Sequence, residues 1–491
     1  MVNAGPSTEH LLSTGGIGQH HEQAMIGTLP DDVLLNIFKF FVNETYCYHN
    51  ATEEWRTLVH VCRRWRTLAF ASPRHLNLQL LCTPPSRSVK DMLDIWPELP
   101  IYVYDVGYPL TEARDDVVAA LRLNHRVSGI RLHKTSDSEW ETFAPLTQHP
   151  FPVLTHLWVQ SCISIKKNKD VIPRSFLGGS APCLRDLRLV YVPFPTLPEL
   201  LLSATNLVRL WYDNIPPSGY ISPQEMVTGL SALPCLESLS LTFRSPQSFA
   251  ERPIRIPPPR SRTLLPALTY IGFLGTTEYM EDLLAQIDTP LLESVNIGLF
   301  DQEVLEVSEL AKFVCRADKL SLLNQAEVTF RSDYISIMLS PIWVTDPKTF
   351  ILNLTCPELA LRLSYITRFC ASCLPNLSPF EFLHIIVPFH HTWQNVVNNS
   401  DPQWLDLLCL FNSVKDLHLS RRVAPHVAQA LRELPAERVM KVLPALEKVF
   451  IPDLKYSGPV KEAISGFAEV RQLSGHPVFI CDLEREVYYR K

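Results

Sequence analysis

The sequence predicts an α/β fold in which a small all-helical module precedes an irregular repeat array with a curved parallel sheet. Two short amphipathic runs lie close together within residues 29–71. From about residue 121 onward, a phrase of the form L-x-x-L-x-L, or close to it, recurs along the chain. A recurring phrase indicates units that stack side by side, because one such unit cannot bury its apolar face alone.

The composition of the 491-residue chain indicates a folded protein, since 46% of the residues are hydrophobic and 20% are charged. A net charge of −6 provides no basic footprint, so nucleic acid is not an expected partner. We find no apolar run of about 18 residues and no secretory signal, so we expect no membrane association. The twelve cysteines show no repeated spacing of the kind that a disulfide framework has. Together these features predict a cytoplasmic or nuclear location with reduced cysteines.

The first amphipathic run predicts a helix that begins near Asp31. Pro30 precedes Asp31 and Asp32, whose carboxylates suit the free N–H groups and the positive dipole end of a helix start. Apolar residues then recur at helical spacing on one face, namely Val33, Leu34, Ile37, Phe38 and Phe41.

The second run predicts another helix, with three arginines mostly off its apolar side. The apolar side carries Leu58, Val59, Cys62, Trp65 and Ala69. Two short helices bury few of their apolar groups against each other. We therefore expect them to need a further surface, supplied by the rest of the chain or by another protein.

Residues 29–71 resemble an F-box. That family opens with Leu-Pro, an acidic pair and an aliphatic helix, and continues to a second helix with V-C-R-x-W and a following leucine. Here the matching residues are Leu29, Pro30, Asp31, Asp32, Val33, Leu34, Ile37, Phe38, Leu58, Val61, Cys62, Arg63, Arg64, Trp65 and Leu68. The insert from Asn43 to Arg56 is longer than the family usually carries, so it forms a surface loop or weakens docking of the usual partner.

The resemblance implies a non-catalytic substrate-recognition subunit of an SCF-type E3 ubiquitin ligase. In that family the F-box docks a Skp-type adaptor, which ties it to a cullin scaffold, and the remaining chain binds an unknown protein target. The adaptor contacts implied here are Leu29, Pro30, Val33, Leu34, Ile37, Phe38, Leu58, Val59, Cys62, Trp65 and Leu68.

Residues 72–120 are predicted to bridge the helical module and the array. Leu76, Leu78 and Leu80 alternate as in a short strand, while residues 89–96 show helical spacing and residues 101–104 look extended.

The repeat phrase is clearest at four places. It occupies residues 153–159, 183–189, 206–212 and 235–241, with weaker copies at 268–273 and 292–297. The intervals of roughly 23 to 32 residues are close to those of leucine-rich repeats. In each phrase, L-x-L is a strand with alternate side chains inward, and the leucine three positions upstream joins the same core. We expect a leucine-rich-repeat solenoid over residues 121–491, with about ten or eleven repeats before residue 455.

Two segments have the composition of loops or tails. Residues 1–28 lack periodicity and predict a disordered tail, in which a His-His-Glu cluster has no further metal ligands. Residues 244–266 are dense in proline and arginine, which excludes a helix or central strand. This second segment is interpreted as a projecting loop, and a polyproline docking site is the alternative. Near the C-terminus, residues 477–481 predict one more strand that closes the array.

The sequence contains no catalytic motif with its structural context, so we expect no enzyme activity, no cofactor and no metal site. Cys370 and Cys373 form a C-x-x-C pair without two further zinc ligands or a βαβ frame. His390 and His391 lie in an expected surface loop.

Aromatic residues and arginine dominate protein-binding hot spots, so those within the repeat phrases are candidates for target contact. They are Trp158, Arg188, Trp211 and Tyr212. The rival function is a leucine-rich-repeat scaffold without any ligase connection, whose helical module only caps the solenoid. The two differ in whether the apolar face of Leu34 and Trp65 is exposed or buried in the chain alone.

Overall fold

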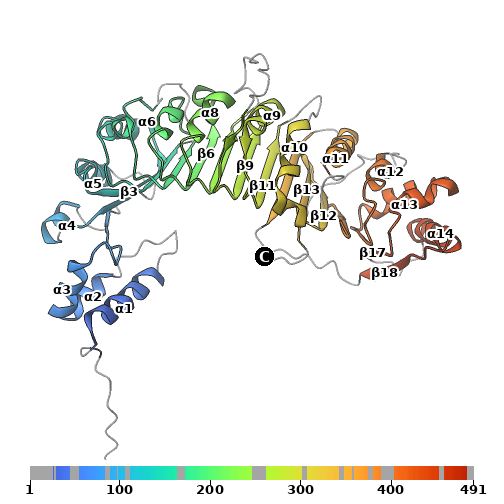
Figure 1. Ribbon diagram of the computed structural model, residues 1–491, viewed down its shortest axis with the longest axis horizontal. Coiled ribbons are helices and arrows are strands. Elements are labelled where there is room, and N and C mark those ends of the chain that lie inside the picture. The colour runs from blue at the N-terminus through green and yellow to red at the C-terminus, as the bar shows by residue number, and fades with distance from the viewer. Residues whose placement is uncertain are drawn as a thin grey trace, which may run out of the picture. The chain divides into compact units, whose positions relative to one another are not determined.

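The structure is a computed structural model (Figure 1). It describes residues 26, 29–44, 55–82, 89–96, 98–105, 111–162, 172–245, 261–300, 307–341, 348–356, 359–373, 380–388, 403–452 and 458–483. Most of the predicted tail, most of the insert after Asn43, most of the Pro-rich loop, and His390 with His391 lie outside these residues. The chain divides into two compact units, Met1–Leu81 and Cys82–Lys491.

The first unit contains three helices, α1 (Asp31–Glu44), α2 (Trp55–Val61) and α3 (Arg63–Ala71). The prediction of a single second helix is therefore wrong. Cys62 adopts an extended backbone between α2 and α3, and its sulfur accepts a hydrogen bond from the Trp65 backbone N–H. An N-cap of this kind begins a new helix in a new direction.

The predicted strand at Leu76–Leu80 begins later than expected. Residues 73–77 form a turn, with Asn77 at a positive φ of 50°, and β1 (Leu80–Cys82) spans the boundary of the two units. The three alternating leucines are nevertheless buried. Their spacing therefore indicated burial rather than a continuous strand.

The second unit alternates helices and strands along most of its length. Its helices are α4 (Val89–Ile95), α5 (Thr111–Leu121), α6 (Asp137–Phe143), α7 (Leu197–Leu201), α8 (Pro223–Leu230), α9 (Thr277–Gln286), α10 (Ser308–Arg316), α11 (Leu359–Cys373), α12 (Gln403–Leu408), α13 (Ala424–Arg432) and α14 (Pro459–Leu473). Its strands are β2 (Ile101–Asp105), β3 (Val127–Thr135), β4 (His156–Ser161), β5 (Asp186–Val190), β6 (Arg209–Ile215), β7 (Ser238–Phe243), β8 (Thr263–Leu264), β9 (Tyr270–Gly275), β10 (Ile287–Asp288), β11 (Ser294–Leu299), β12 (Gln325–Phe330), β13 (Tyr334–Ser340), β14 (Thr349–Thr355), β15 (Phe382–Ile386), β16 (Asp416–Leu419), β17 (Lys448–Pro452) and β18 (Phe479–Leu483).

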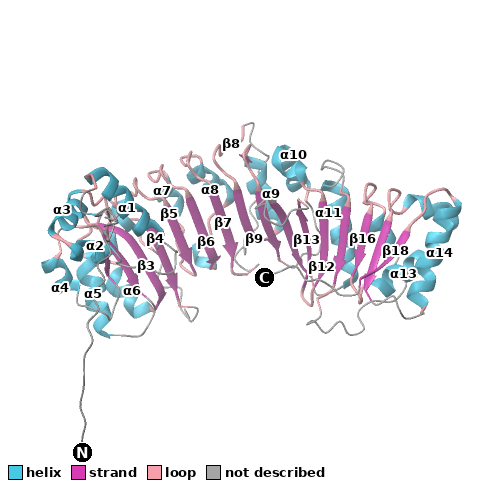
Figure 2. Cartoon of the chain, turned by 90° about the horizontal axis from the view of Figure 1, so that it is seen from below, coloured by secondary structure: helices cyan, strands magenta, loops and turns pink. Residues whose placement is uncertain are grey.

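One large sheet runs through this unit, with the helices along one of its faces (Figures 1 and 2). From β2 onward its order is β2-β3-β4-β5-β6-β7-β9-β11-β14-β13-β12-β15-β16-β17-β18. The strand pairs of this sheet from β2 onward are parallel except those of β13, which is antiparallel to both β12 and β14. The prediction of a parallel sheet throughout is thus wrong at this one point. The turn at Arg331–Asp333 reverses the chain after β12, so β13 and β14 fill the two positions between β12 and β11.

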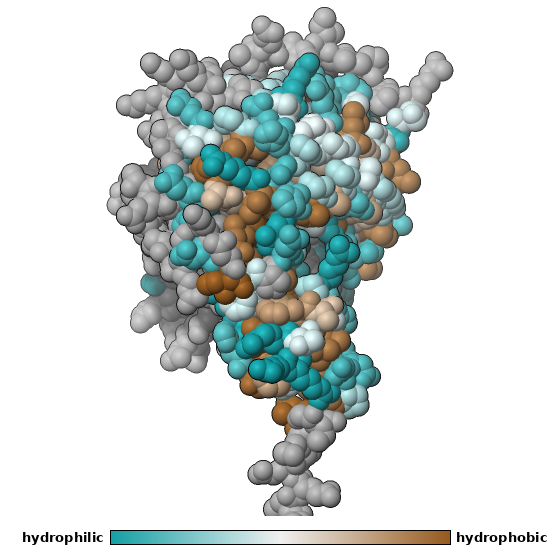
Figure 3. Space-filling model, turned by 90° about the vertical axis from the view of Figure 1, so that its left-hand side faces the viewer, coloured by the Kyte–Doolittle hydropathy of each residue, from teal (hydrophilic) through white to brown (hydrophobic). Residues whose placement is uncertain are grey.

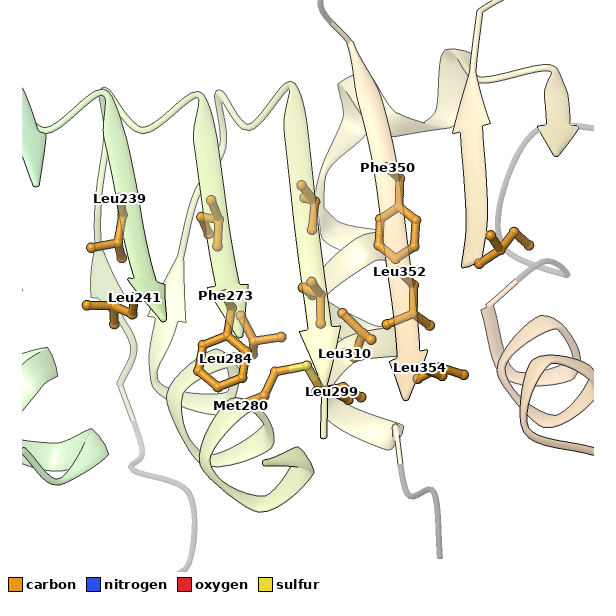
Figure 4. Close-up of a cluster of buried hydrophobic side chains, with 14 of the residues drawn as sticks. Leu239, Leu241, Phe273, Met280, Leu284, Leu299, Leu310, Phe350, Leu352 and Leu354 are labelled. Atoms are coloured by element: carbon orange, nitrogen blue, oxygen red, sulfur yellow. The ribbon is translucent and has the colours of Figure 1, made fainter. Parts of the chain in front are cut away.

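The leucines of the repeat phrase form a continuous core between the sheet and its helices. The leucine upstream of each strand is buried, as predicted, at Leu154, Leu184, Leu207 and Leu236. Figure 4 shows the same arrangement further along, where Leu239 and Leu241 of β7 and Phe350 to Leu354 of β14 flank helix residues Met280, Leu284 and Leu310. The second unit is a leucine-rich-repeat-like solenoid, because each strand–helix unit buries its apolar face only against its neighbours.

Candidate functional site

Helix α1 carries two apolar faces rather than one. Leu34, Phe38 and Val42 are buried, and α1 packs against α2 and α3. A second set lies next to the first at spacing i, i+4, i+7 and i+8, and all four side chains of this set are exposed. It comprises Val33 (38%), Ile37 (39%), Phe40 (66%) and Phe41 (40%), and is called the exposed α1 strip below. An amphipathic helix normally presents one apolar stripe, so the second stripe is available to a partner.

The buried face is fixed by aromatic contacts within the helical unit. Phe38 packs on Trp65 of α3 with 4.7 Å between ring centroids. Trp55 of α2 meets Phe70 of α3 edge-on, and its indole N–H donates to the Gln79 carbonyl. These contacts hold the three helices together, so the exposed α1 strip has a rigid support.

The start of α1 is held by an arginine from α3. The Arg64 guanidinium donates to the Asp31 carboxylate at 2.6 Å and to the carbonyl oxygen of Leu29. The contact is exposed, so its contribution to stability is small. Its effect is to fix the Leu-Pro segment relative to α3.

The structure separates the predicted adaptor contacts into two groups. Leu34, Phe38, Leu58 and Val59 are between 0% and 6% exposed, so they belong to the core of the helical unit rather than to a docking surface. The prediction that these four contact an adaptor is wrong, because their side chains are already buried. Leu34, whose exposure was to separate an adaptor-docking module from a cap, is therefore buried within the chain alone. The remaining predicted contacts are exposed or half-exposed: Leu29, Pro30, Val33, Ile37, Cys62, Trp65 and Leu68.

Three exposed apolar residues were missing from the predicted contacts. They are Phe40 and Phe41 of α1 and Val61 at the end of α2, the last 59% exposed. The signal was present in the sequence, because α1 has eight apolar residues between positions 33 and 42, more than one stripe holds. Figure 3 shows brown hydrophobic atoms between hydrophilic ones on one side of the molecule.

A second surface of interest is the sheet face of the array that points away from the helices. Strand residues at one register position form a line across β2, β3, β4, β5 and β6. Its members alternate between aromatic and cationic and are called the arginine–aromatic row: Tyr104, Arg131, Trp158, Arg188 and Trp211. The row brings together three of the four residues predicted to contact a target.

The fourth predicted contact, Tyr212, does not lie on this surface, so the prediction that it contacts a target is wrong. Its side chain is fully buried, and its hydroxyl accepts a hydrogen bond from the Phe194 N–H and donates to the Gly219 carbonyl. Successive strand residues point to opposite faces, so Tyr212 shares the inward face with Leu210, and Trp211 points outward. Burial also raises the pKa of Tyr212 far above its ordinary value. Tyr212 is a structural residue of the core.

The structure provides no chemical site at the C-x-x-C pair. Cys370 and Cys373 lie in α11 without exposed surface, and burial raises the pKa of both thiols, which disfavours the reactive thiolate. Among the residues that the structure describes, no three His, Cys, Asp or Glu side chains gather as a metal site would require. None of the helices in the described ranges is long and apolar enough to cross a membrane.

Comparison with known proteins gives one family match. The family model described as F-box-like matches residues 26–75, the segment that contains α1, α2 and α3. No curated protein matches the chain.

Among solved structures, the chain is similar to the leucine-rich repeat-containing protein LegL7 from Legionella pneumophila. The two share 12% identity, and the match covers 81% of this chain and 98% of that chain with a TM-score of 0.28. The family match and the architecture described above together identify an F-box-like domain at residues 26–75 followed by a leucine-rich-repeat-like array.

Proposed function

We propose that this protein is a non-catalytic substrate-recognition subunit of an SCF-type E3 ubiquitin ligase in the cytoplasm or nucleus. Residues 29–71 dock a Skp-type adaptor linked to a cullin scaffold, residues 72–120 bridge, and residues 121–491 bind the target protein. The observation that carries the proposal is the exposed α1 strip, an exposed apolar surface on a domain that matches the F-box-like family.

The exposed α1 strip suits a protein partner. Phe40 alone is 66% exposed, and Ile37 and Phe41, four positions apart, lie on the same strip. Contiguous apolar surface on a soluble unit marks an interaction site, and aromatic anchors supply most of the binding energy at such sites. A solenoid cap would instead present a polar outer face.

The mechanism that follows is proximity. A receptor that holds a target on one module and the adaptor on another raises the effective concentration of target lysines near the conjugating enzyme. No chemistry by this chain is required.

The test is binding of the purified full chain to a purified Skp-type adaptor, measured by isothermal titration calorimetry. The variant Ile37→Asp/Phe41→Asp places two carboxylates on the exposed α1 strip, and we expect at least a ten-fold loss of affinity. The matched control is Asn36→Asp/Lys39→Asp, at exposed positions of the same helix that lie outside the strip. This control changes the net charge more than the strip variant does, so a general electrostatic effect would weaken adaptor binding by the control at least as much.

The expected result is normal binding by the control and loss of binding by the strip variant, with both melting as the wild type does. If the wild-type chain binds no Skp-type adaptor, the proposal fails, and the chain is a repeat scaffold without a ligase connection.

A further inference from the structure

The arginine–aromatic row is built as a continuous stack. The Arg131 guanidinium lies 5.0 Å from the ring centroid of Tyr104 and 3.8 Å from that of Trp158. Arg188 follows on the other side of Trp158, at 4.6 Å from its ring and 4.6 Å from that of Trp211. Each cation therefore lies between two aromatic rings supplied by the neighbouring strands.

Stacking of this kind orients the guanidinium groups before any ligand arrives. The rings cover the faces of the planar guanidinium, so its N–H groups remain along the edges. His133 adds to the support, since its Nε2 lies 2.7 Å from Arg131 Nε and its ring meets Trp158 at 4.5 Å. A side chain that is already fixed loses less entropy when it forms hydrogen bonds to an anion.

Arg188 keeps hydrogen-bonding capacity within this stack. Its Nη2 is 3.5 Å from the Asp213 carboxylate, an ion pair with no hydrogen bond between them, and its buried Nε has no partner. One third of the side chain, 34%, is exposed to solvent. Because Nε is buried, only the exposed part of this guanidinium can donate to an added anion, and Arg188 is half-buried whereas Arg131 is buried.

The charge balance around the row favours an anionic ligand. The outward-facing charged residues of β3 to β6 described here are three arginines and two aspartates: Arg131, Arg188, Arg209, Asp186 and Asp213. Asp186 pairs with Arg209. Burial raises the pKa of Asp213, against the effect of Arg188.

The stack ends at Trp211, and the residues at the same register position in the later strands are of other types. Its next members, Ser240, Gly272 and Asn296, have short side chains. Further along, His384, His418 and Phe450 stack in parallel at 4.3 Å and 4.1 Å, without arginine. Stacked guanidinium groups thus characterise the N-terminal part of the sheet face.

The spacing of the two arginines selects a type of peptide. Arg131 and Arg188 lie two strands apart, and adjacent strands are about 4.8 Å from each other, which gives about 10 Å. An extended or polyproline II segment advances about 3.1–3.3 Å per residue, so its residues i and i+3 span about the same distance. A chain lying across the strands could then place one carboxylate on Arg188, an apolar residue over Trp158, and a second carboxylate beside Arg131, which is 9% exposed.

We propose that the arginine–aromatic row is the docking surface for an extended acidic segment of the target protein, with carboxylates three residues apart and proline or another apolar residue between them. The inference rests on the proposed function in that it names the class of target for the array. The binding surface itself does not require the adaptor.

The test uses the purified full chain and a fluorescein-labelled peptide, Gly-Glu-Pro-Pro-Glu-Pro-Pro-Glu-Gly, with binding followed by fluorescence anisotropy. One comparison peptide carries Lys in place of each Glu, and another carries the three Glu residues consecutively. We expect the first peptide to bind most tightly and its affinity to fall at least several-fold as salt rises from about 50 to about 300 mM.

Arg188→Gln should weaken binding at least ten-fold. The matched control, Arg185→Gln, removes the same charge at an exposed position just before β5 and should change affinity less than two-fold. Trp211→Leu keeps every charge but removes one ring beside Arg188, so it should also weaken binding, which a purely electrostatic surface would not show. Melting curves of all variants provide the check on folding.

The proposal is overturned if the wild-type chain does not bind the acidic peptide, if the lysine peptide binds more tightly, or if the two arginine variants lose affinity equally. Adaptor binding is measured on the same samples. Retained peptide binding without adaptor binding would reject the ligase role and leave the docking surface intact, and the opposite result would reject only the docking surface.

Discussion

The ring of Phe38 lies against the indole of Trp65, with 4.7 Å between their centroids and 57° between their planes. Phe38 is fully buried, and this contact joins α1 to α3. It supports the exposed α1 strip from behind, so the buried and exposed faces of the same helix have separate roles that substitutions can distinguish.

Phe38→Ala is expected to destabilise the helical unit by about 3–5 kcal/mol, because it removes a buried aromatic side chain and leaves a cavity. Hydrogen exchange of the full chain should show faster exchange across α1 and α3 and unchanged exchange in β4 to β9. Val33→Ala, on the exposed strip of the same helix, is the comparison and should leave exchange in the free chain unchanged. Equal protection in the Phe38 variant and the wild type would contradict this account of the core.

Tyr212→Phe is expected to lower the stability of the array by about 1–3 kcal/mol, since it leaves the buried Phe194 N–H and Gly219 carbonyl without their partner. Urea denaturation measures the change. Binding of the acidic peptide should be unaffected. Trp211→Leu should instead weaken peptide binding and leave the stability of the array unchanged. A Tyr212 variant that loses peptide binding at full stability would restore this residue to the binding surface.

Arg471 of α14 is a buried cation that forms hydrogen bonds with the backbone. It is fully buried and donates hydrogen bonds to the carbonyl oxygens of Leu443, Pro444 and Leu446, in the segment that leads into β17. Burial lowers its pKa.

Arg471→Met should cost about 2–4 kcal/mol, because the carbonyl groups lose their donors while staying buried. Limited proteolysis should then cut first in the C-terminal repeats. The exposed Arg438→Met is the control, and similar resistance of the two variants would show that these hydrogen bonds contribute little.

The stacked histidines make the C-terminal part of the array sensitive to acid. Burial, together with the nearby His384, lowers the pKa of His418 from 6.5 to about 4, and burial also lowers that of His384 against the opposing effects of Glu327 and Asp416. The unfolded chain therefore binds protons between pH 6.5 and about pH 4 that the folded chain does not. The stabilisation from neutral His418 is complete above pH 6.5 and is lost as the pH falls toward 4.

We expect the melting temperature to decline over that range, and His418→Phe to reduce the decline because a phenyl ring keeps the stack without titrating. Thermal denaturation at several pH values measures this. Substitution of the exposed His125 by Gln is the control. An unchanged decline in His418→Phe would assign the acid sensitivity to other groups.

The sequence by itself determined which residues alternate and which recur. The L-x-L phrase placed β4, β5, β6 and β7 within a few residues of their observed positions, because strand alternation and the upstream leucine are local properties of the chain. The same alternation already implied that Tyr212 points inward with Leu210. The acidic pair after Pro30 likewise marked the start of α1.

Tertiary structure alone decided which neighbours those residues have. Whether Leu34 or Ile37 is buried depends on how α2 and α3 pack on α1, and the register between strands places Arg188 between Trp158 and Trp211. The reversal at β13 depends on the turn after β12, which leads to the insertion of β13 and β14 between β12 and β11 in the sheet. These choices arise from contacts between residues far apart in the chain, about which a local pattern carries no information.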